Sequence, residues 1–249
     1  MTTTTTDLGD TPMATQNEPG SLISVSSLTK TYGATRALDG LDLDLSAGQI
    51  VGLLGENGCG KTTLLKVLAG VLVDYTGQVR VAGYAPGPES KAAVSFLPDV
   101  SFLPDSARVS FCLDLYADFF PDFRRERASD LIGFFGLPES MRLKAMSKGM
   151  REKVQIALAM AREAEVYLLD EPISGVDPAA RQTILDGITR TFDEDSLLLI
   201  STHLVHDLEP LLDAAVMMRA GTVLLSGQAD DLREEHGAGL DSIFREVYR

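Results

Sequence analysis

Hydrophobic and polar positions alternate in one stretch near the start of the chain and give way to continuous apolar runs further on. The segment LDLDL, residues 41–45, has an apolar side chain at every second position, which is typical of a strand with one buried face. The runs IVGLL (50–54), VYLLD (166–170) and LLLIS (197–201) are almost entirely apolar. Such runs are typical of parallel strands that are covered on both faces. The pattern predicts an α/β fold with a mostly parallel sheet and an N-terminal antiparallel β subdomain.

A different pattern lies between Phe96 and Phe135, where aromatic and charged residues mix at helical spacing. Nine aromatic residues fall in this stretch, although the whole chain has only ten Phe and six Tyr. We therefore expect an α-helical subdomain inserted at about residues 100–163. Its rings form either the core of that subdomain or, because many large rings crowd a small unit, a surface for a partner.

Composition limits the number of domains and the class of protein. Residues 1–20 are Thr-rich and poor in apolar side chains, so we expect a disordered tail there and one folded domain over 21–249. The net charge of −14 disfavours a nucleic-acid partner, because such a surface repels polyanions. No apolar stretch approaches the ~18 residues of a membrane span, and two cysteines are too few for a disulfide framework. We expect a cytoplasmic protein that does not itself cross the membrane.

Residues 55–62, GENGCGKT, match the phosphate-binding pattern G-x-x-x-x-G-K-[ST] and follow an apolar strand. In such a loop the glycines let backbone N–H groups surround phosphates, a Lys adds a point charge, and a hydroxyl ligates Mg²⁺. Lys61 and Thr62 would take the last two roles, so the loop predicts a site for a nucleoside triphosphate and Mg²⁺. The residues expected to contact the nucleotide here are Gly55, Glu56, Asn57, Gly58, Cys59, Gly60, Lys61, Thr62 and Thr63.

Two adjacent carboxylates, Asp170 and Glu171, stand where the strand VYLLD ends. Such a pair is about as often a solvated turn as a functional site. Beside a phosphate-binding loop the catalytic interpretation is favoured. Because alternation along a strand points the two side chains apart, one is expected to hold Mg²⁺ and the other to act on the nucleophile. We expect Asp170 to hold Mg²⁺ and Glu171 to act on a water that attacks the γ-phosphate. An attack by water indicates that the reaction is hydrolysis.

Five short motifs follow one another in order: GENGCGKTT (55–63), MSKGM (146–150), VYLLDEP (166–172), SGVDP (174–178) and STH (201–203). In this order they resemble the ATP-binding cassette family, over the chain from about residue 22 to its end. The resemblance implies an ATPase subunit that powers a separate transmembrane permease on the inner face of the cell membrane. It also implies a head-to-tail homodimer, or a heterodimer with a related subunit. The SKGM form resembles bacterial exporter subunits, so export is the expected direction.

The same resemblance implies roles for single residues. Tyr32 would stack on adenine, and His203 would contact the γ-phosphate and join Lys61 and Glu171 in catalysis. The residues implied to contact nucleotide across the dimer interface are Ser147, Gly149 and Asp177.

Two positions depart from the family pattern. Where the family usually has a Gln, the segment VSFLPD places Asp99, which offers an oxygen to Mg²⁺ but adds negative charge beside a triphosphate. The signature, usually L-S-G-G-Q, reads MSKGM and begins a helix predicted to run to about residue 162. That helix start is rich in Lys and Arg, although a helix N-terminus favours acidic residues. Taken alone, this helix start is a solvated basic turn. The resemblance implies instead that it binds an anion, the γ-phosphate of the ATP held by the other subunit.

Cys59 stands where the family more often has Ala or Ser. A thiol near Lys61 at a helix N-terminus has a lowered pKa and reacts readily. We therefore expect alkylation of Cys59 to block ATP hydrolysis and bound MgATP to protect the thiol.

Two rival functions fit parts of the pattern. One is a soluble cassette ATPase of translation or DNA repair, which a single cassette and a net charge of −14 disfavour. The other is a regulatory nucleotide-binding module that hydrolyses slowly because of Asp99 and the unusual signature.

Overall fold

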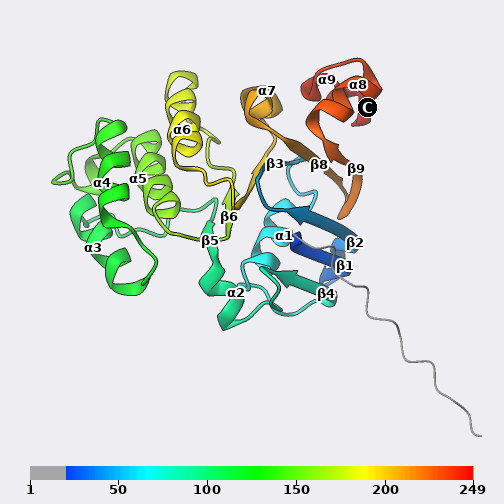
Figure 1. Cartoon of the computed structure of the whole chain (residues 1–249), viewed down its shortest axis with the longest axis horizontal. Helices are drawn as coiled ribbons and strands as arrows, with labels where there is room; N and C mark the ends of the chain where they lie inside the picture. Colours follow the sequence, from blue (N-terminus) through cyan, green and yellow to red (C-terminus); the bar gives the residue numbers. More distant parts are fainter. Residues whose placement is uncertain (1–20, 249) are drawn as a thin grey trace, which may run out of the picture.

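Two β-sheets, a helix between them and a helical lobe to one side build the chain (Figure 1). This computed structural model describes residues 21–248, so the tail expected over residues 1–20 lies outside the described residues. The order and pairing of the elements confirm the expected α/β class with an antiparallel sheet at the N-terminal side.

The smaller sheet is antiparallel, with the strand order β2 (Thr35–Ser46), β1 (Ser21–Tyr32) and β4 (Thr76–Val81). Within β2, the three leucines of residues 41–45 are buried and the two aspartates between them are exposed. The alternation in the sequence therefore predicted this strand and its buried face correctly.

The larger sheet has, in spatial order, the strands β5 (Val94–Leu97), β6 (Val166–Asp170), β7 (Leu197–Thr202), β3 (Gln49–Leu54), β8 (Ala214–Arg219) and β9 (Thr222–Gln228). All neighbours are parallel except β9, which runs antiparallel to β8. On β7, Leu197 and Leu199 belong to one buried cluster, whereas Leu198 and Ile200 belong to the other. The three predicted apolar runs are β3, β6 and β7, and burial on both faces explains their continuous apolar sequence.

Helix α1 (Lys61–Leu68) lies between the two sheets. Leu64 and Leu68 share a buried cluster with Ile23 of β1 and Val51 of β3. Because α1 follows β3 after six residues, its N-terminus is fixed at the carboxyl end of that strand. The other helices outside the lobe are α2 (Pro88–Ala93), α6 (Pro178–Thr191), α7 (Val205–Leu208), the 3-10 turn η2 (Glu209–Leu211), α8 (Ala229–His236) and α9 (Leu240–Val247).

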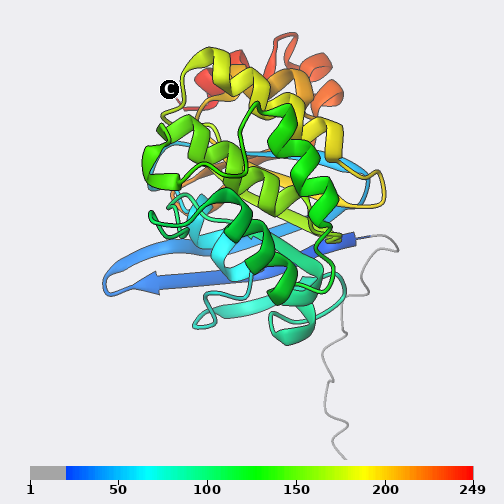
Figure 2. The same cartoon turned by 90° about the vertical axis from the view of Figure 1, so that its left-hand side faces the viewer.

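The helical lobe, drawn in green, projects to one side in Figure 1 and faces the viewer in Figure 2. Its rings are divided: Phe123 and Phe135 are buried in the core of the lobe, whereas Phe111 and Phe119 are exposed, and a partner surface stays a prediction. None of the helices over residues 21–248 is both long enough and apolar enough to span a bilayer. The lobe contains α3 (Val109–Phe119), α4 (Arg125–Phe134), the 3-10 turn η1 (Leu143–Ala145) and α5 (Lys148–Met160).

The register of the parallel strands gathers polar residues at one edge of the larger sheet. Asp170 on β6 pairs with Ser201 on β7, and Leu54 on β3 pairs with Thr202 on β7. Because the carboxyl ends of parallel strands lie at the same edge, the loops that follow β3, β6 and β7 converge there. This edge is where ligands bind in sheets of this kind.

Candidate functional site

A pocket of about 210 Å³ lies between residues 55–62, which we call the phosphate loop, and the end of β6. Gly60 caps α1 in the left-handed region at φ 114°, and a Cβ there would lie 2.5 Å from the carbonyl oxygen of Ala37. Only glycine meets both conditions, so the loop keeps its backbone close to the pocket. The lining residues are Ala37, Asn57, Gly58, Gly60, Lys61, Thr62, Thr63, Asp99 and Glu171.

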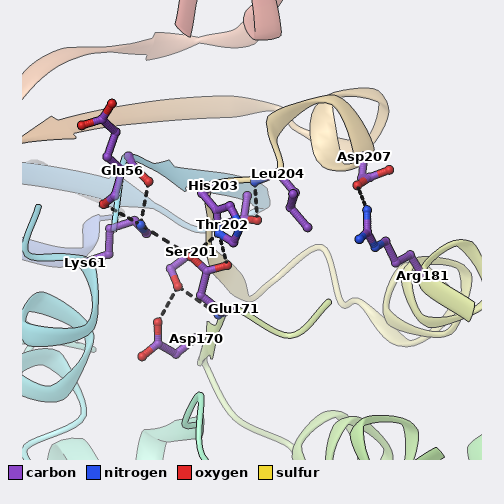
Figure 3. A network of polar contacts seen from close by, with 11 residues as sticks. Glu56, Lys61, Asp170, Glu171, Arg181, Ser201, Thr202, His203, Leu204 and Asp207 are labelled. Atoms are coloured by element: carbon purple, nitrogen blue, oxygen red, sulfur yellow. Dashed lines mark hydrogen bonds and ion pairs between the residues drawn. The ribbon is translucent and has the colours of Figure 1, made fainter. Parts of the chain in front are cut away.

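Lys61 is buried beside this pocket, and the loop itself holds its ammonium group. Nζ donates to the carbonyl oxygens of Gly55 at 2.7 Å and Glu56 at 3.2 Å. It also lies 3.5 Å from Oε1 of Glu171 (Figure 3). An ammonium group at the N-terminus of α1 adds a full charge to the positive end of the helix dipole. The pocket therefore suits a polyanion such as a triphosphate.

Glu171 projects between Lys61 and His203 (Figure 3). Its carboxylate lies 2.9 Å from Nδ1 of His203 and is largely buried. The backbone of Glu171 has φ 51°, a conformation that costs about 1–3 kcal/mol in a residue with a side chain and that clusters at functional sites. Its N–H donates to the carbonyl oxygen of Ser201 at 3.1 Å, which holds the strained turn in place.

Ser201 is a site residue that the sequence reasoning did not single out. Its hydroxyl donates to Oδ1 of Asp170 at 2.6 Å and accepts the N–H of Glu171 at 3.0 Å. One side chain therefore fixes both acidic residues, and their side chains make different contacts. Strand register is the signal that could have found it, since Ser201 lies beside Asp170 on the neighbouring parallel strand.

Asp170 presents one carboxylate oxygen for a cation. The residue is buried, and Oδ2 has no hydrogen-bond partner among the described residues. Burial raises the pKa of Asp170 above its ordinary value, and the hydrogen bond from Ser201 and the nearby hydroxyl of Thr62 act in the opposite direction. The negative charges of Asp99 and Glu171 raise this pKa further. A cation beside Oδ2 would offset the cost of burying the charge.

The oxygen atoms at this edge fit Mg²⁺. Asp170 and Thr62 lie together, and Asp99 lines the same pocket. Within residues 21–248, no group of three or more His, Cys, Asp or Glu side chains forms a complete metal cage. Mg²⁺ typically binds through one or two carboxylates and completes its shell with water and substrate phosphates. These residues could therefore hold Mg²⁺ together with a bound phosphate group.

The structure contradicts the expectation of a reactive Cys59. Its side chain is buried, and burial raises the pKa of the thiol by more than the charge of Lys61 lowers it. The sulfur faces the back of the phosphate loop, where a Cβ on Gly55 would lie 2.5 Å from it. The predicted low pKa of Cys59 was wrong because the sequence shows the nearby lysine but not the burial.

Ser147 and Gly149 lie outside the pocket, at the start of α5. The Ser147 hydroxyl accepts the N–H of Met150 at 3.3 Å and so caps the helix that was predicted to begin in the segment MSKGM. A Cβ on Gly149 would lie 3.3 Å from Val176, so the helix start packs closely on the loop before α6. These two residues do not join the chain's own phosphate loop.

Asp177 and Tyr32 are also separate from the pocket lining. Asp177 accepts the N–H of Ala180 at 3.0 Å and caps α6. Tyr32 ends β1, is 49% exposed, and has its ring centre 4.9 Å from Nζ of Lys30. The chain thus gathers the phosphate side of the site in one place, and nucleotide contacts from Tyr32, Ser147, Gly149 and Asp177 stay predictions.

The two departures from the family pattern line one hollow of about 430 Å³ between β5 and α5. Asp99 contributes a carboxylate to it and Lys148 an ammonium group. In the same hollow, burial raises the pKa of Glu152 and the charge of Lys148 lowers it. Asp99 and Lys148, the two charged residues by which this sequence departs from the family pattern, therefore lie in the same hollow.

Comparisons with known proteins identify the family. Residues 38–174 match the family model for ABC (ATP-binding cassette) transporters. The chain is 32% identical over 234 residues to the daunorubicin resistance ATP-binding protein DrrA3 of Streptomyces coeruleorubidus, which covers 90% of this chain and 74% of that protein. It is 31% identical over 235 residues to the Nod factor export ATP-binding protein I of Ralstonia nicotianae, with 91% and 72% covered. A solved ATP-binding subunit of an ABC transporter aligns with a TM-score of 0.80 at 28% identity, over 92% of this chain and 100% of that chain. The chain therefore belongs to the ABC transporter family, as one of its ATP-binding, ATP-hydrolysing subunits.

Proposed function

We propose that this chain binds MgATP at the phosphate loop, hydrolyses it, and drives export through a separate membrane-spanning permease. The observation that carries the proposal is the Glu171 carboxylate, which lies between Lys61 and His203 beside a glycine-lined pocket. Export is inferred from relatives whose names state drug resistance and Nod factor export.

Each residue of the pocket has a distinct task in this mechanism. Lys61 and the N–H groups of the loop bind the β and γ phosphates. Glu171 accepts a proton from the attacking water while the bond from the γ-phosphorus to the leaving oxygen breaks, and His203 orients that carboxylate and contacts the γ-phosphate. Thr62 and Asp170 would hold Mg²⁺, which neutralises charge on the phosphate oxygens when bound.

The proposal includes a second subunit, either another copy of this chain or a related chain. Ser147 and Gly149 lie outside their own chain's pocket, and Lys148 and Arg151 make that helix start basic. A helix N-terminus of this kind favours an anion. In a head-to-tail dimer it would meet the γ-phosphate bound by the other subunit, with Asp177 at the same interface.

The permease is proposed to dock on the helical lobe. Phe111 and Phe119 on α3 are exposed, as are Val100 and Phe102 in the loop before it. Large apolar side chains that are exposed to solvent can mark interaction sites when they form a contiguous patch. Docking there would hold this subunit at the inner face of the cell membrane.

Replacing Glu171 by Gln tests the mechanism, because Gln keeps the size of the side chain but does not accept the proton. We expect the rate of MgATP turnover to fall about 10²–10⁴-fold, the range for loss of a general base. Glu165→Gln, at the exposed residue just before the opposite end of β6, is the matched control and should keep the wild-type rate. Wild-type turnover by Glu171→Gln would remove Glu171 from catalysis and favour the slow regulatory module instead.

A further inference from the structure

Helix α9 connects two parts of the site that are distant in the sequence. Its first turn is bound to Glu209, whose carboxylate accepts the N–H groups of Leu240 at 2.7 Å and Asp241 at 3.2 Å. Glu209 belongs to η2, which follows α7 and so continues the segment that starts at His203. The start of α9 is therefore attached to the segment that carries a proposed catalytic residue.

The other end of α9 reaches the back of the phosphate loop. The Tyr248 hydroxyl donates to the carbonyl oxygen of Met218 on β8. A Cβ on Gly55 would lie 2.5 Å from Sγ of Cys59, 2.8 Å from that carbonyl oxygen and 3.3 Å from the Tyr248 hydroxyl. These three groups therefore fill the space beside Gly55, and none of them lines the pocket.

Several contacts keep Tyr248 in this place. Its ring centre lies 4.4 Å from that of Phe244, one helical turn earlier. Burial raises the pKa of Tyr248, and the neighbouring Cys59 and Glu56 raise it further, so the hydroxyl stays protonated and remains a donor. The loop is also held from the turn between β8 and β9, because the N–H of Gly221 donates to the carbonyl oxygen of Cys59 at 2.9 Å.

Gly55 links this packing to the phosphate side. Its carbonyl oxygen accepts the ammonium of Lys61 at 2.7 Å, so a displacement of Gly55 would displace the charge that meets the phosphates. Small displacements of positioning groups are costly because the site must hold its geometry within a fraction of an ångström.

We infer that Tyr248 is a positioning residue of the ATP site: through Met218 and Gly55 it fixes the phosphate loop in the conformation that presents Lys61. The inference rests on the proposed function. It assigns a task in nucleotide binding to a residue that lies outside all five sequence motifs and supports one of them, the phosphate loop, by packing against it.

The test compares Tyr248→Phe, which removes only the hydroxyl, with Tyr84→Phe at a half-exposed tyrosine in the turn after β4. For Tyr248→Phe we expect KM for MgATP to rise about fivefold with kcat near wild type, the change produced by loss of one typical hydrogen bond. Maleimide labelling of Cys59, followed by mass spectrometry without nucleotide, should accelerate by a similar factor because the loop opens more often. Tyr84→Phe should change neither quantity.

Cys112, which is buried in the helical lobe, serves as the internal standard. Equal acceleration at Cys59 and Cys112 would mean general destabilisation and would overturn the inference. An unchanged KM, or an unchanged labelling rate of Cys59, would overturn it as well. A wild-type chain that does not hydrolyse MgATP would contradict the proposed function, whereas the labelling result reports on the contact between Tyr248 and the loop without any nucleotide.

Discussion

Helices α1 and α5 both begin with a lysine next to glycine, yet their N-termini are built in opposite ways. At α1, Gly60 is the cap, and Lys61 is 5% exposed with its ammonium bound to two carbonyl oxygens. At α5, Ser147 is the cap, Lys148 is exposed, and the first turn carries no acidic residue. One positive helix end is enclosed by its own chain, and the other faces outward.

This difference distinguishes a phosphate site that the chain forms by itself from a helix N-terminus that is proposed to contribute to a site formed with a second subunit. Around α1, the charged groups are already positioned by Ser201, His203 and the loop carbonyls. Around α5, Arg151 pairs with Asp105 of the same chain, whereas the exposed Ser147 at the helix N-terminus lines no part of the chain's own phosphate pocket. Changes at the start of α5 should therefore affect assembly and turnover, and changes at α1 should affect binding to a single chain.

The largest effect is expected from Gly149→Asp, which adds a negative charge beside Val176, at the helix start that is proposed to bind the second subunit's phosphate. Like charges in contact across an interface cost several kcal/mol, so turnover and ATP-dependent dimerisation should fall at least about 100-fold. The Kd of the monomer for MgATP should stay near wild type, as measured by calorimetry. Gly133→Asp on α4, where a Cβ meets nothing within 4 Å, is the matched control. Normal dimerisation of Gly149→Asp would show that the start of α5 does not bind the second subunit's phosphate, and would contradict the proposed difference between α1 and α5.

A second test replaces each of the two lysines, one at a time, by alanine. Lys61→Ala should weaken MgATP binding to the monomer about 10–100-fold, because charge-assisted hydrogen bonds to phosphate are worth roughly 1.5–3 kcal/mol. Lys148→Ala should leave this Kd near wild type and lower only turnover. Equal losses of monomer affinity in both variants would show that α5 contributes to its own chain's pocket.

Ser201→Ala tests whether the Ser201 hydroxyl is needed to position the two acidic residues, Asp170 and Glu171, at the edge of the sheet. Loss of the hydroxyl leaves Oδ1 of Asp170 buried without its donor, which should lower the free energy of unfolding by about 1–3 kcal/mol and kcat by about tenfold. Ser196→Ala, whose hydroxyl donates to Asp193 just before the other end of β7, is the control for loss of a buried hydroxyl. Its kcat should remain unchanged, and a kcat for Ser201→Ala that equals the control would reduce Ser201 to a structural residue.

The smallest effect concerns Asp99 and the pH dependence of stability. The pKa of Asp170 is raised in the folded chain, so the folded state binds more protons than the unfolded state between the two pKa values, and stability falls as pH rises through that window. Asp99→Asn removes one charge that raises this pKa, so the loss of stability with rising pH should become smaller. The change should be less than about 1 kcal/mol because Asp99 is exposed. Tm measured across this pH range, with Asp44→Asn on the exposed face of β2 as control, checks the sign. A pH profile equal to that of the control would show that Asp99 does not act on Asp170.

The sequence predicted the features that depend on local pattern. Apolar runs located β3, β6 and β7, the glycine-rich segment located the phosphate loop, and Ser147 was placed correctly at a helix start. These succeed because periodicity, turn chemistry and capping act over a few residues.

The sequence failed where contacts join distant segments. Cys59 was expected to be reactive from its neighbours, but burial of the thiol raises its pKa by more than the charge of Lys61 lowers it. Ser201 becomes visible only through the register of β6 against β7. Tyr248 lies at the far end of the chain from the loop it supports, so no local pattern indicates it.

The left-handed backbone at Glu171 affects how a saturation mutagenesis scan of this position must be interpreted. Val, Ile and Thr would be depleted there even if no reaction took place, since β-branched side chains tolerate φ near 51° poorly. Gly and Asn would be enriched for stability alone, because they adopt that conformation readily. Fitness scores at position 171 therefore combine backbone cost with chemistry. Gln is informative because its backbone preferences are close to those of Glu, so the difference between these two residues isolates the proton acceptor.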